Sequence, residues 1–107
     1  TAIQPYVMSI FKYDPRIEIA KLKEHKILIL QGTTDLQIKV KDAEALNKAA
    51  EGSQLHIIEG MNHVLKIADI ERTKNLATYY DTSLPIPEEL FDQIKIFITN
   101  KTSNIDE

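Results

Sequence analysis

The sequence contains no cysteine in its 107 residues. This absence excludes disulfide bonds, thiolate metal sites and cysteine nucleophiles. It also fits a reducing compartment, so we expect a cytoplasmic location. The first residues have neither the basic region nor the apolar core of a secretory signal peptide, and no such signal is expected.

Long apolar runs and concentrated basic charge are absent as well. No apolar run approaches the roughly 20 residues that span a bilayer, so we expect no membrane partner. The formal net charge is −3 with interspersed signs, which gives no electrostatic reason to expect a nucleic acid partner. The three histidines show no ligand spacing, and we expect neither a metal site nor a cofactor. They are His25, His56 and His63.

The composition is that of an ordinary globular protein, with 43% hydrophobic and 27% charged residues. A chain of this length forms one domain at most. We find no repeat, linker or low-complexity segment. Residues 1–107 are therefore expected to form a single unit of the α/β class, with a frayed polar tail at 100–107.

Two short strands joined by a helix are predicted in the middle of the chain. Residues 27–30, Ile-Leu-Ile-Leu, form a continuous apolar run typical of a strand buried on both faces. Residues 40–50 have helical spacing, and Gly52 lies where a helix-terminating glycine belongs. Residues 54–59 predict the second strand. The order strand, helix, strand favours a crossover that pairs the strands in parallel.

Helices are predicted on both sides of this unit. Apolar spacing indicates one within residues 2–12. Asp14 suits the N-cap and Pro15 the first turn of a short helix that extends to Leu22. The clearest helix begins at Glu88. Its apolar face consists of Leu90, Ile94, Phe97 and Ile98.

Residues 61–86 carry no clear period. The stretches Tyr79-Tyr80-Asp81 and Leu84-Pro85-Ile86-Pro87 are typical of an extended, partly exposed loop. The two tyrosines suit either the lining of a substrate entrance or packing within a surface loop. The sequence leaves both roles open.

The predicted strands belong to a larger sheet than two strands can make. Both are predicted to be buried on both faces, yet a two-stranded sheet has open edges and is marginal in water. The remaining strands therefore lie in upstream sequence or in another chain. We expect the isolated chain to form a homo-oligomer through its exposed strand edge, and a folded monomer in sedimentation would contradict this.

Two residues that can carry chemistry follow the strands. Asp35 comes after the first, in Leu-Gln-Gly-Thr-Thr-Asp-Leu, and His63 after the second, in Glu-Gly-Met-Asn-His-Val. The carboxyl ends of neighbouring parallel strands lie at one edge of a sheet, so these side chains can meet. A carboxylate there accepts a hydrogen bond from Nδ1–H of the imidazole, which leaves Nε2 to deprotonate another group.

These polar residues also have purely structural interpretations. Asp35 can cap its turn, and His63 can bond to loop backbone. Asp42 and Glu44, near a helix start, suit capping and the helix dipole better than acid catalysis. His56 lies within a strand and suits a structural or solvated role.

Together the motifs resemble the last two core strands of the α/β-hydrolases. The likeness lies in Ile-Leu-Ile-Leu-Gln-Gly-Thr-Thr-Asp, the following helix and Leu-His-Ile-Ile-Glu-Gly-Met-Asn-His, and it covers roughly residues 14–99. In that family the chain order is serine, acid, histidine. The resemblance implies a partial α/β-hydrolase fold, with Asp35 as the triad acid and His63 as the general base. Tyr-Asp-Pro at 13–15 is similar to the esterase and aminopeptidase-like branches.

The chain departs from that family at the nucleophile. The family's serine lies in Gly-x-Ser-x-Gly upstream of the acid, and no serine here has this flanking pattern. The oxyanion-hole donors that accompany it are missing too. We therefore expect the C-terminal fragment of a serine hydrolase that cleaves a small-molecule ester, or less readily an amide, and that is inactive alone. The alternative is a non-catalytic interaction module derived from the same fold.

Overall fold

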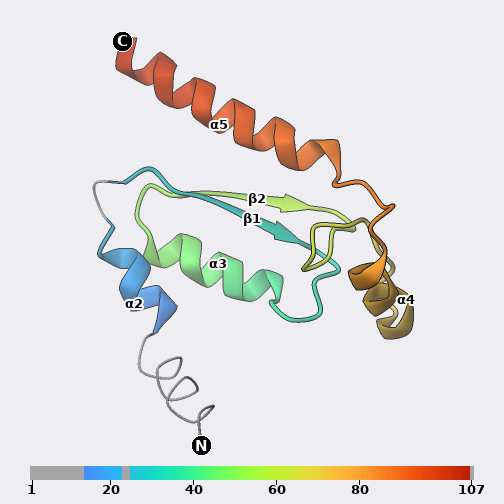
Figure 1. Ribbon diagram of the computed structural model, residues 1–107. Coiled ribbons are helices and arrows are strands. Elements are labelled where there is room, and N and C mark those ends of the chain that lie inside the picture. The colour runs from blue at the N-terminus through green and yellow to red at the C-terminus, as the bar shows by residue number, and fades with distance from the viewer. Residues whose placement is uncertain (1–13, 23–24, 107) are drawn as a thin grey trace, which may run out of the picture.

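The computed structural model describes residues 14–22 and 25–106, and the helix predicted within residues 2–12 lies outside them. Helix α3 covers one face of a two-stranded sheet and α5 the other, while α4 lies where the strands end (Figure 1). The described chain is thus of the α/β class. Its elements are α2 (Pro15–Ala20), β1 (Leu28–Gly32), α3 (Val40–Ala49), β2 (Gln54–Ile58), α4 (Arg72–Ala77), the 3₁₀ helix η1 (Thr78–Tyr80) and α5 (Glu88–Asp106).

The predicted parallel pair of strands is confirmed. β1 and β2 pair in parallel, with Leu28 opposite Gln54 and Gly32 opposite Ile58. The connection between them contains α3, as the helical spacing predicts. β1 extends past its apolar run through Gln31 to Gly32, so its end lies closer to the Asp35 turn than expected.

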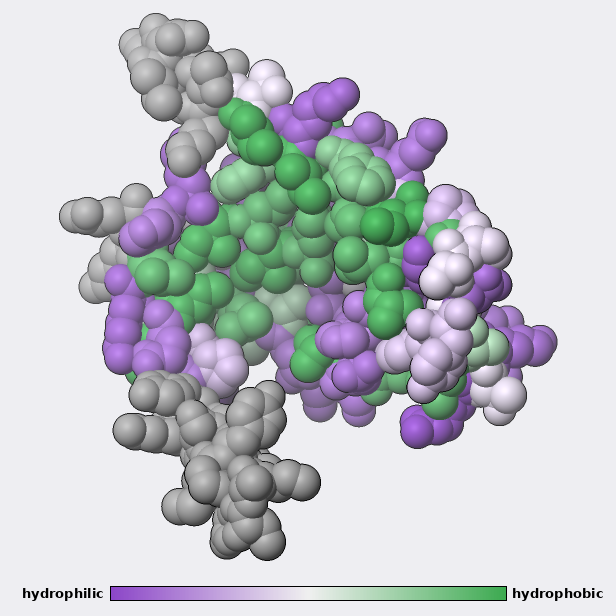
Figure 2. All heavy atoms as spheres, in the orientation of Figure 1, coloured by the Kyte–Doolittle hydropathy of each residue, from purple (hydrophilic) through white to green (hydrophobic). Residues whose placement is uncertain are grey.

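The prediction that both strands are buried on both faces is wrong for this chain. Most strand residues are half-buried, and only Gln31, Gly32 and Ile58 are fully buried. Within the described residues each strand has one neighbour and one open edge, so solvent reaches side chains that further strands would cover. Apolar side chains gather across the middle of the face seen in Figure 2.

Helices α2 and α3 begin at capping residues that the sequence predicts. The Asp14 side chain accepts a hydrogen bond of 3.0 Å from the backbone N–H of Arg16, and Pro15 occupies the first turn of α2. At the start of α3, the backbone N–H of Lys39 donates to the Asp42 carboxylate over 3.1 Å. This bond gives Asp42 the capping role expected of it.

α5 packs on the sheet through few of its apolar residues. Leu90 joins Ile58 and Met61 in the buried core. Ile94 and Ile98 are exposed, although they share the predicted apolar face. The helix continues to Asp106, through most of the segment 100–107 that the sequence predicts to fray. No helix in the described ranges has the length and apolar character needed to cross a bilayer.

α4 and η1 occupy a region without a clear sequence period. Tyr79 and Tyr80 lie in η1, so the extended conformation predicted for them is wrong. The Glu71 carboxylate caps α4 by accepting from the backbone N–H groups of Thr73 and Lys74. A helix of six residues with a side-chain cap has too few turns to show an apolar period.

Candidate functional site

The carboxyl ends of the two strands bring both predicted site residues together. Asp35 follows β1 and His63 follows β2. His63 Nδ1 lies 3.0 Å from Asp35 Oδ2. The pair therefore lies at the sheet edge where residues after parallel strands converge.

The Asp35 carboxylate is held by both of its oxygens. Oδ1 accepts from the backbone N–H groups of Gln37 and Ile38 over 2.8 and 2.9 Å. Oδ2 is left to face His63. The turn-capping interpretation of Asp35 is thus correct for one oxygen, and it fixes the direction in which the other points. The side chain is only 8% exposed.

The surroundings of Asp35 keep its carboxyl ionised. Burial by itself raises its pKa, because a charged group loses hydration. Hydrogen bonds from Ile38 N–H, from the His63 ring and from Gln37 N–H outweigh burial, so the pKa lies below the ordinary value of 3.8. At neutral pH the group is a carboxylate that can only accept hydrogen bonds.

The ionised acid determines how the His63 ring is protonated. Since Asp35 can only accept, Nδ1 carries the hydrogen in this contact, and in the neutral ring Nε2 is then unprotonated. The His63 side chain is 41% exposed. This arrangement leaves Nε2 able to take a proton from a group outside the described residues.

The end of β1 and the loop after β2 are in close backbone contact. The N–H of Thr34 donates to the carbonyl of Met61 over 3.1 Å. A Cβ on Gly32 would lie 1.9 Å from that Met61 oxygen, so only glycine fits at this position. Since Met61 is two residues before His63, this approach brings the histidine loop against the acid loop.

Sequence reasoning missed two glutamines beside Asp35. Gln31 Nε2 donates to Ile38 O over 2.9 Å and lies 3.5 Å from Asp35 Oδ2. Gln37 Nε2 donates to the hydroxyl of Tyr79 over 2.8 Å, which ties η1 to the acid turn. The signal that could have identified Gln31 is a polar residue directly after the apolar run of β1. Nothing local in the sequence links Gln37 to Tyr79.

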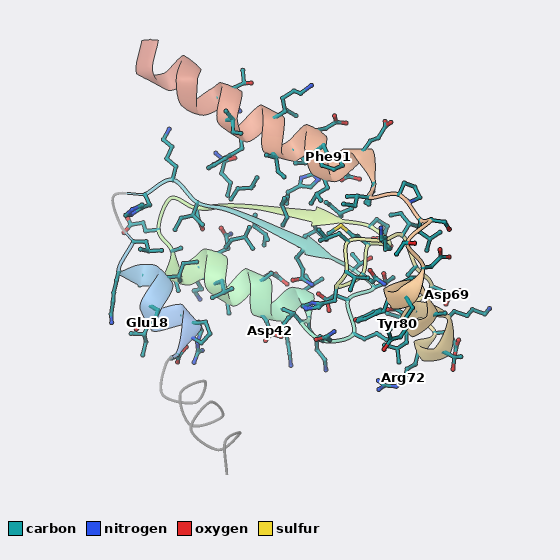
Figure 3. All side chains as sticks on the ribbon, viewed as in Figure 1. Glu18, Asp42, Asp69, Arg72, Tyr80 and Phe91 are labelled. Atoms are coloured by element: carbon teal, nitrogen blue, oxygen red, sulfur yellow. The ribbon has the colours of Figure 1, made fainter. Side chains whose placement is uncertain are left out.

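Tyr80 is 91% exposed. Figure 3 shows it beside α4, near Asp69 and Arg72, at the end toward which the strand arrows point. It therefore lies at the same end of the sheet as the acid and the histidine. Its side chain therefore packs against little of the described part of the chain.

The described serines have hydrogen-bond partners away from His63. Ser53, just before β2 at the opposite end of the sheet, donates to Asn47 Oδ1 over 2.7 Å. Ser83 donates to the carboxylate of Asp81. Neither is bonded to the His63 ring. The side chains of Ser9 and Ser103 lie outside the described residues.

The other polar residues considered in the sequence analysis have structural or solvent-exposed positions. His56 Nε2 lies 2.7 Å from Glu89 Oε2, which joins the middle of β2 to the first turn of α5. Glu44 is exposed on α3. Among the described residues, no group of three or more ligating side chains is placed to hold a metal ion.

A pocket of about 310 Å³ opens between α2 and α3. Its lining includes Arg16, Ile38 and Leu46 but neither Asp35 nor His63.

Comparisons with protein-family models, with curated proteins and with solved structures find no match to this chain. The geometry of the acid and histidine is therefore the basis for a functional proposal.

Proposed function

We propose that this chain supplies the acid and the general base of a serine hydrolase of the α/β-hydrolase type. The observation that carries the proposal is the contact between a buried, backbone-anchored Asp35 carboxylate and Nδ1 of His63. It uses Nδ1 of a ring whose side chain is 41% exposed, so Nε2 is left for base catalysis. The order of acid and histidine after successive parallel strands supports the same reading.

The nucleophilic serine and the oxyanion donors come from outside these 107 residues. In the first step, the serine oxygen bonds to the ester carbonyl carbon while its proton passes to Nε2 of His63. The proton then goes to the departing alcohol as the ester C–O bond breaks. In the second step His63 takes a proton from water as the water oxygen bonds to the acyl carbon; the bond from that carbon to the serine oxygen then breaks, and His63 returns the proton to the serine, which releases the carboxylic acid. Asp35 stabilises the imidazolium in both steps.

Small-molecule esters are the proposed substrates, with amides as slower ones, and the cytoplasm is the proposed location. The isolated chain is expected to be inactive, because the acid and base have no hydroxyl to activate. A longer protein that contains the chain is expected to hydrolyse a short-chain p-nitrophenyl ester. Intact masses of the full-length gene product and of the 107-residue chain would identify the two forms.

The test compares two histidine variants in that longer protein. We expect His63→Ala to lower kcat by roughly 10³-fold or more, as removal of a triad member does. The matched control is His56→Ala, which removes a histidine that also contacts a carboxylate. It should change kcat less than about twofold, because a surface ion pair contributes little even to stability. Hydrolysis that survives His63→Ala would contradict the proposal.

A second candidate, an interaction module, is favoured by the open sheet. Among the described residues, β1 and β2 pair only with each other. Unpaired strand edges recruit another strand, so we propose pairing between copies of the isolated chain as the non-catalytic alternative. Sedimentation tests the pairing: a concentration-dependent dimer or larger species of the purified chain supports it, and a folded monomer excludes it. Ester hydrolysis by a longer protein that contains the chain distinguishes the hydrolase from this module.

A further inference from the structure

Two asparagines next to the site are withdrawn from solvent. Asn62 is 1% exposed and Asn75 is 0% exposed. A buried amide destabilises a fold unless it is hydrogen-bonded, so the partners of these side chains matter. Asn62 directly precedes His63, and Asn75 lies in α4.

Asn75 forms hydrogen bonds with every group of its amide. Its Nδ2 donates to Thr34 O over 2.7 Å and to Asp69 O over 2.9 Å. Its Oδ1 accepts from Asn62 Nδ2 over 3.2 Å. The reverse orientation of the amide would set Oδ1 against two carbonyl oxygens, so the donors and acceptor are unambiguous. The hydroxyl of Thr78 also donates to the backbone carbonyl of Asn75 over 2.7 Å.

Asn62 closes the loop that carries His63. Its second Nδ2 hydrogen bond, of 2.7 Å, is to Thr78 Oγ1. Its Oδ1 accepts from the backbone N–H groups of Val64 and Lys66, and its own N–H donates to Lys66 O over 2.8 Å. His63 thus lies in a small ring of hydrogen bonds whose anchor is the Asn62 side chain. A fully satisfied buried network of this kind is rigid.

Thr34 directly precedes Asp35, and Asn62 directly precedes His63. We propose that Asn75 is a positioning residue that joins these two loops and thereby holds Asp35 Oδ2 and His63 Nδ1 in contact. The inference rests on the proposed function for its catalytic meaning. The placement of the ring, however, is measurable without any activity.

The experiment records the imidazole ¹⁵N shifts of His63 at the same high pH in the wild-type chain and in Asn75→Asp. The variant keeps the shape of the side chain but removes both N–H groups that hold Thr34 O and Asp69 O. In the wild type we expect widely separated shifts for protonated Nδ1 and bare Nε2. In the variant the two shifts should converge, because the ring is no longer held to one tautomer.

In an active longer protein, Asn75→Asp should lower kcat by about 10²-fold, as a displacement of about 1 Å in a site does, with KM changed less than about twofold. The matched control is Asn47→Asp, the same chemical change in the last turn of α3, where Asn47 accepts from Ser53 just before β2. It should leave the His63 shifts and kcat as in the wild type.

A second variant decides the matter if Asn75→Asp does not fold. Thr78→Val removes the hydroxyl that accepts from Asn62 but preserves side-chain volume. It should move the His63 shifts partway toward each other. Wild-type His63 shifts in a folded Asn75→Asp or, failing that, in Thr78→Val overturn the inference. A longer protein that is inert, together with altered His63 shifts in the variants, would instead contradict the proposed function and support the positioning role.

Discussion

Two histidine–carboxylate pairs occur among the described residues, and the shorter one is not the candidate site. His56 Nε2 lies 2.7 Å from Glu89 Oε2, whereas His63 Nδ1 lies 3.0 Å from Asp35 Oδ2. The acid is 48% exposed in the first pair and 8% exposed in the second. Hydrogen-bond length alone therefore does not distinguish a site from a surface ion pair.

The difference lies in what holds the acid and which ring nitrogen it uses. Two backbone N–H groups hold Oδ1 of Asp35, and Oδ2 of the same carboxylate contacts His63. Glu89 reaches His56 from the first turn of α5, with nearly half of its side chain in solvent. A contact through Nδ1 turns Nε2 outward, while a contact through Nε2 occupies the nitrogen farther from the backbone. Anchoring and orientation thus separate the two pairs.

The largest effect is expected from Gly32→Ala, which disturbs the Asp35–His63 pair and not the His56–Glu89 pair. In Gly32→Ala the new methyl meets the Met61 carbonyl, which is backbone and cannot move aside cheaply. We expect the free energy of unfolding to fall by about 2–4 kcal/mol. Urea denaturation measures the loss, and His63 ring shifts should change more than those of His56.

The control for that substitution is Gly52→Ala. Gly52 has a φ of +83° but nothing within 4 Å of an added Cβ. Its cost is the backbone conformation alone, about 1–2 kcal/mol. A loss in Gly32→Ala no larger than that in Gly52→Ala would show that the approach to Met61 is not tight.

Lowering the pH tests how much the ionised Asp35 carboxylate stabilises the fold. Its folded-state pKa lies below the ordinary 3.8, so the unfolded chain binds the proton first as the pH falls. The carboxylate therefore stabilises the fold above pH 3.8, and this contribution is lost as the pH falls through the lowered pKa. Urea unfolding across this window should give a shallower loss of stability for Asp35→Asn than for the wild type. Equal slopes would mean that Asp35 is not anchored as described.

The smallest effect is expected at the surface pair. A double-mutant cycle of His56→Ala and Glu89→Gln should give a coupling of about 0.5 kcal/mol, within the range of exposed ion pairs. Added salt should reduce it further. A coupling above about 2 kcal/mol would mean that this pair is a structural element comparable to the buried network.

The sequence predicts the strand–helix–strand unit well because its signals are local. An apolar run, a helical period in residues 40–50 and Gly52 define the elements, and the strand-end rule brings Asp35 and His63 together. The half-burial of the strands escapes prediction, because it depends on how many neighbours each strand has, and a local apolar run does not show this.

The second layer of the site escapes prediction for a different reason. Asn75 meets Thr34 across 41 positions and Gln37 meets Tyr79 across 42. An isolated asparagine or glutamine carries no period and no spacing from which such a partner can be inferred. These contacts follow from where α4 and η1 pack, which only the three-dimensional structure reveals.

The acid and the histidine are only 28 positions apart. Loop-closure entropy rises with the logarithm of length, so bringing such ends together costs about 3 kcal/mol plus a constant. The segment between them contains α3 and β2, and Asn75 in α4 joins its two ends through Thr34 and Asn62. A separation of 28 in a chain of 107 residues makes the contact a non-local one, so we expect the pair to form together with the pairing of β1 and β2.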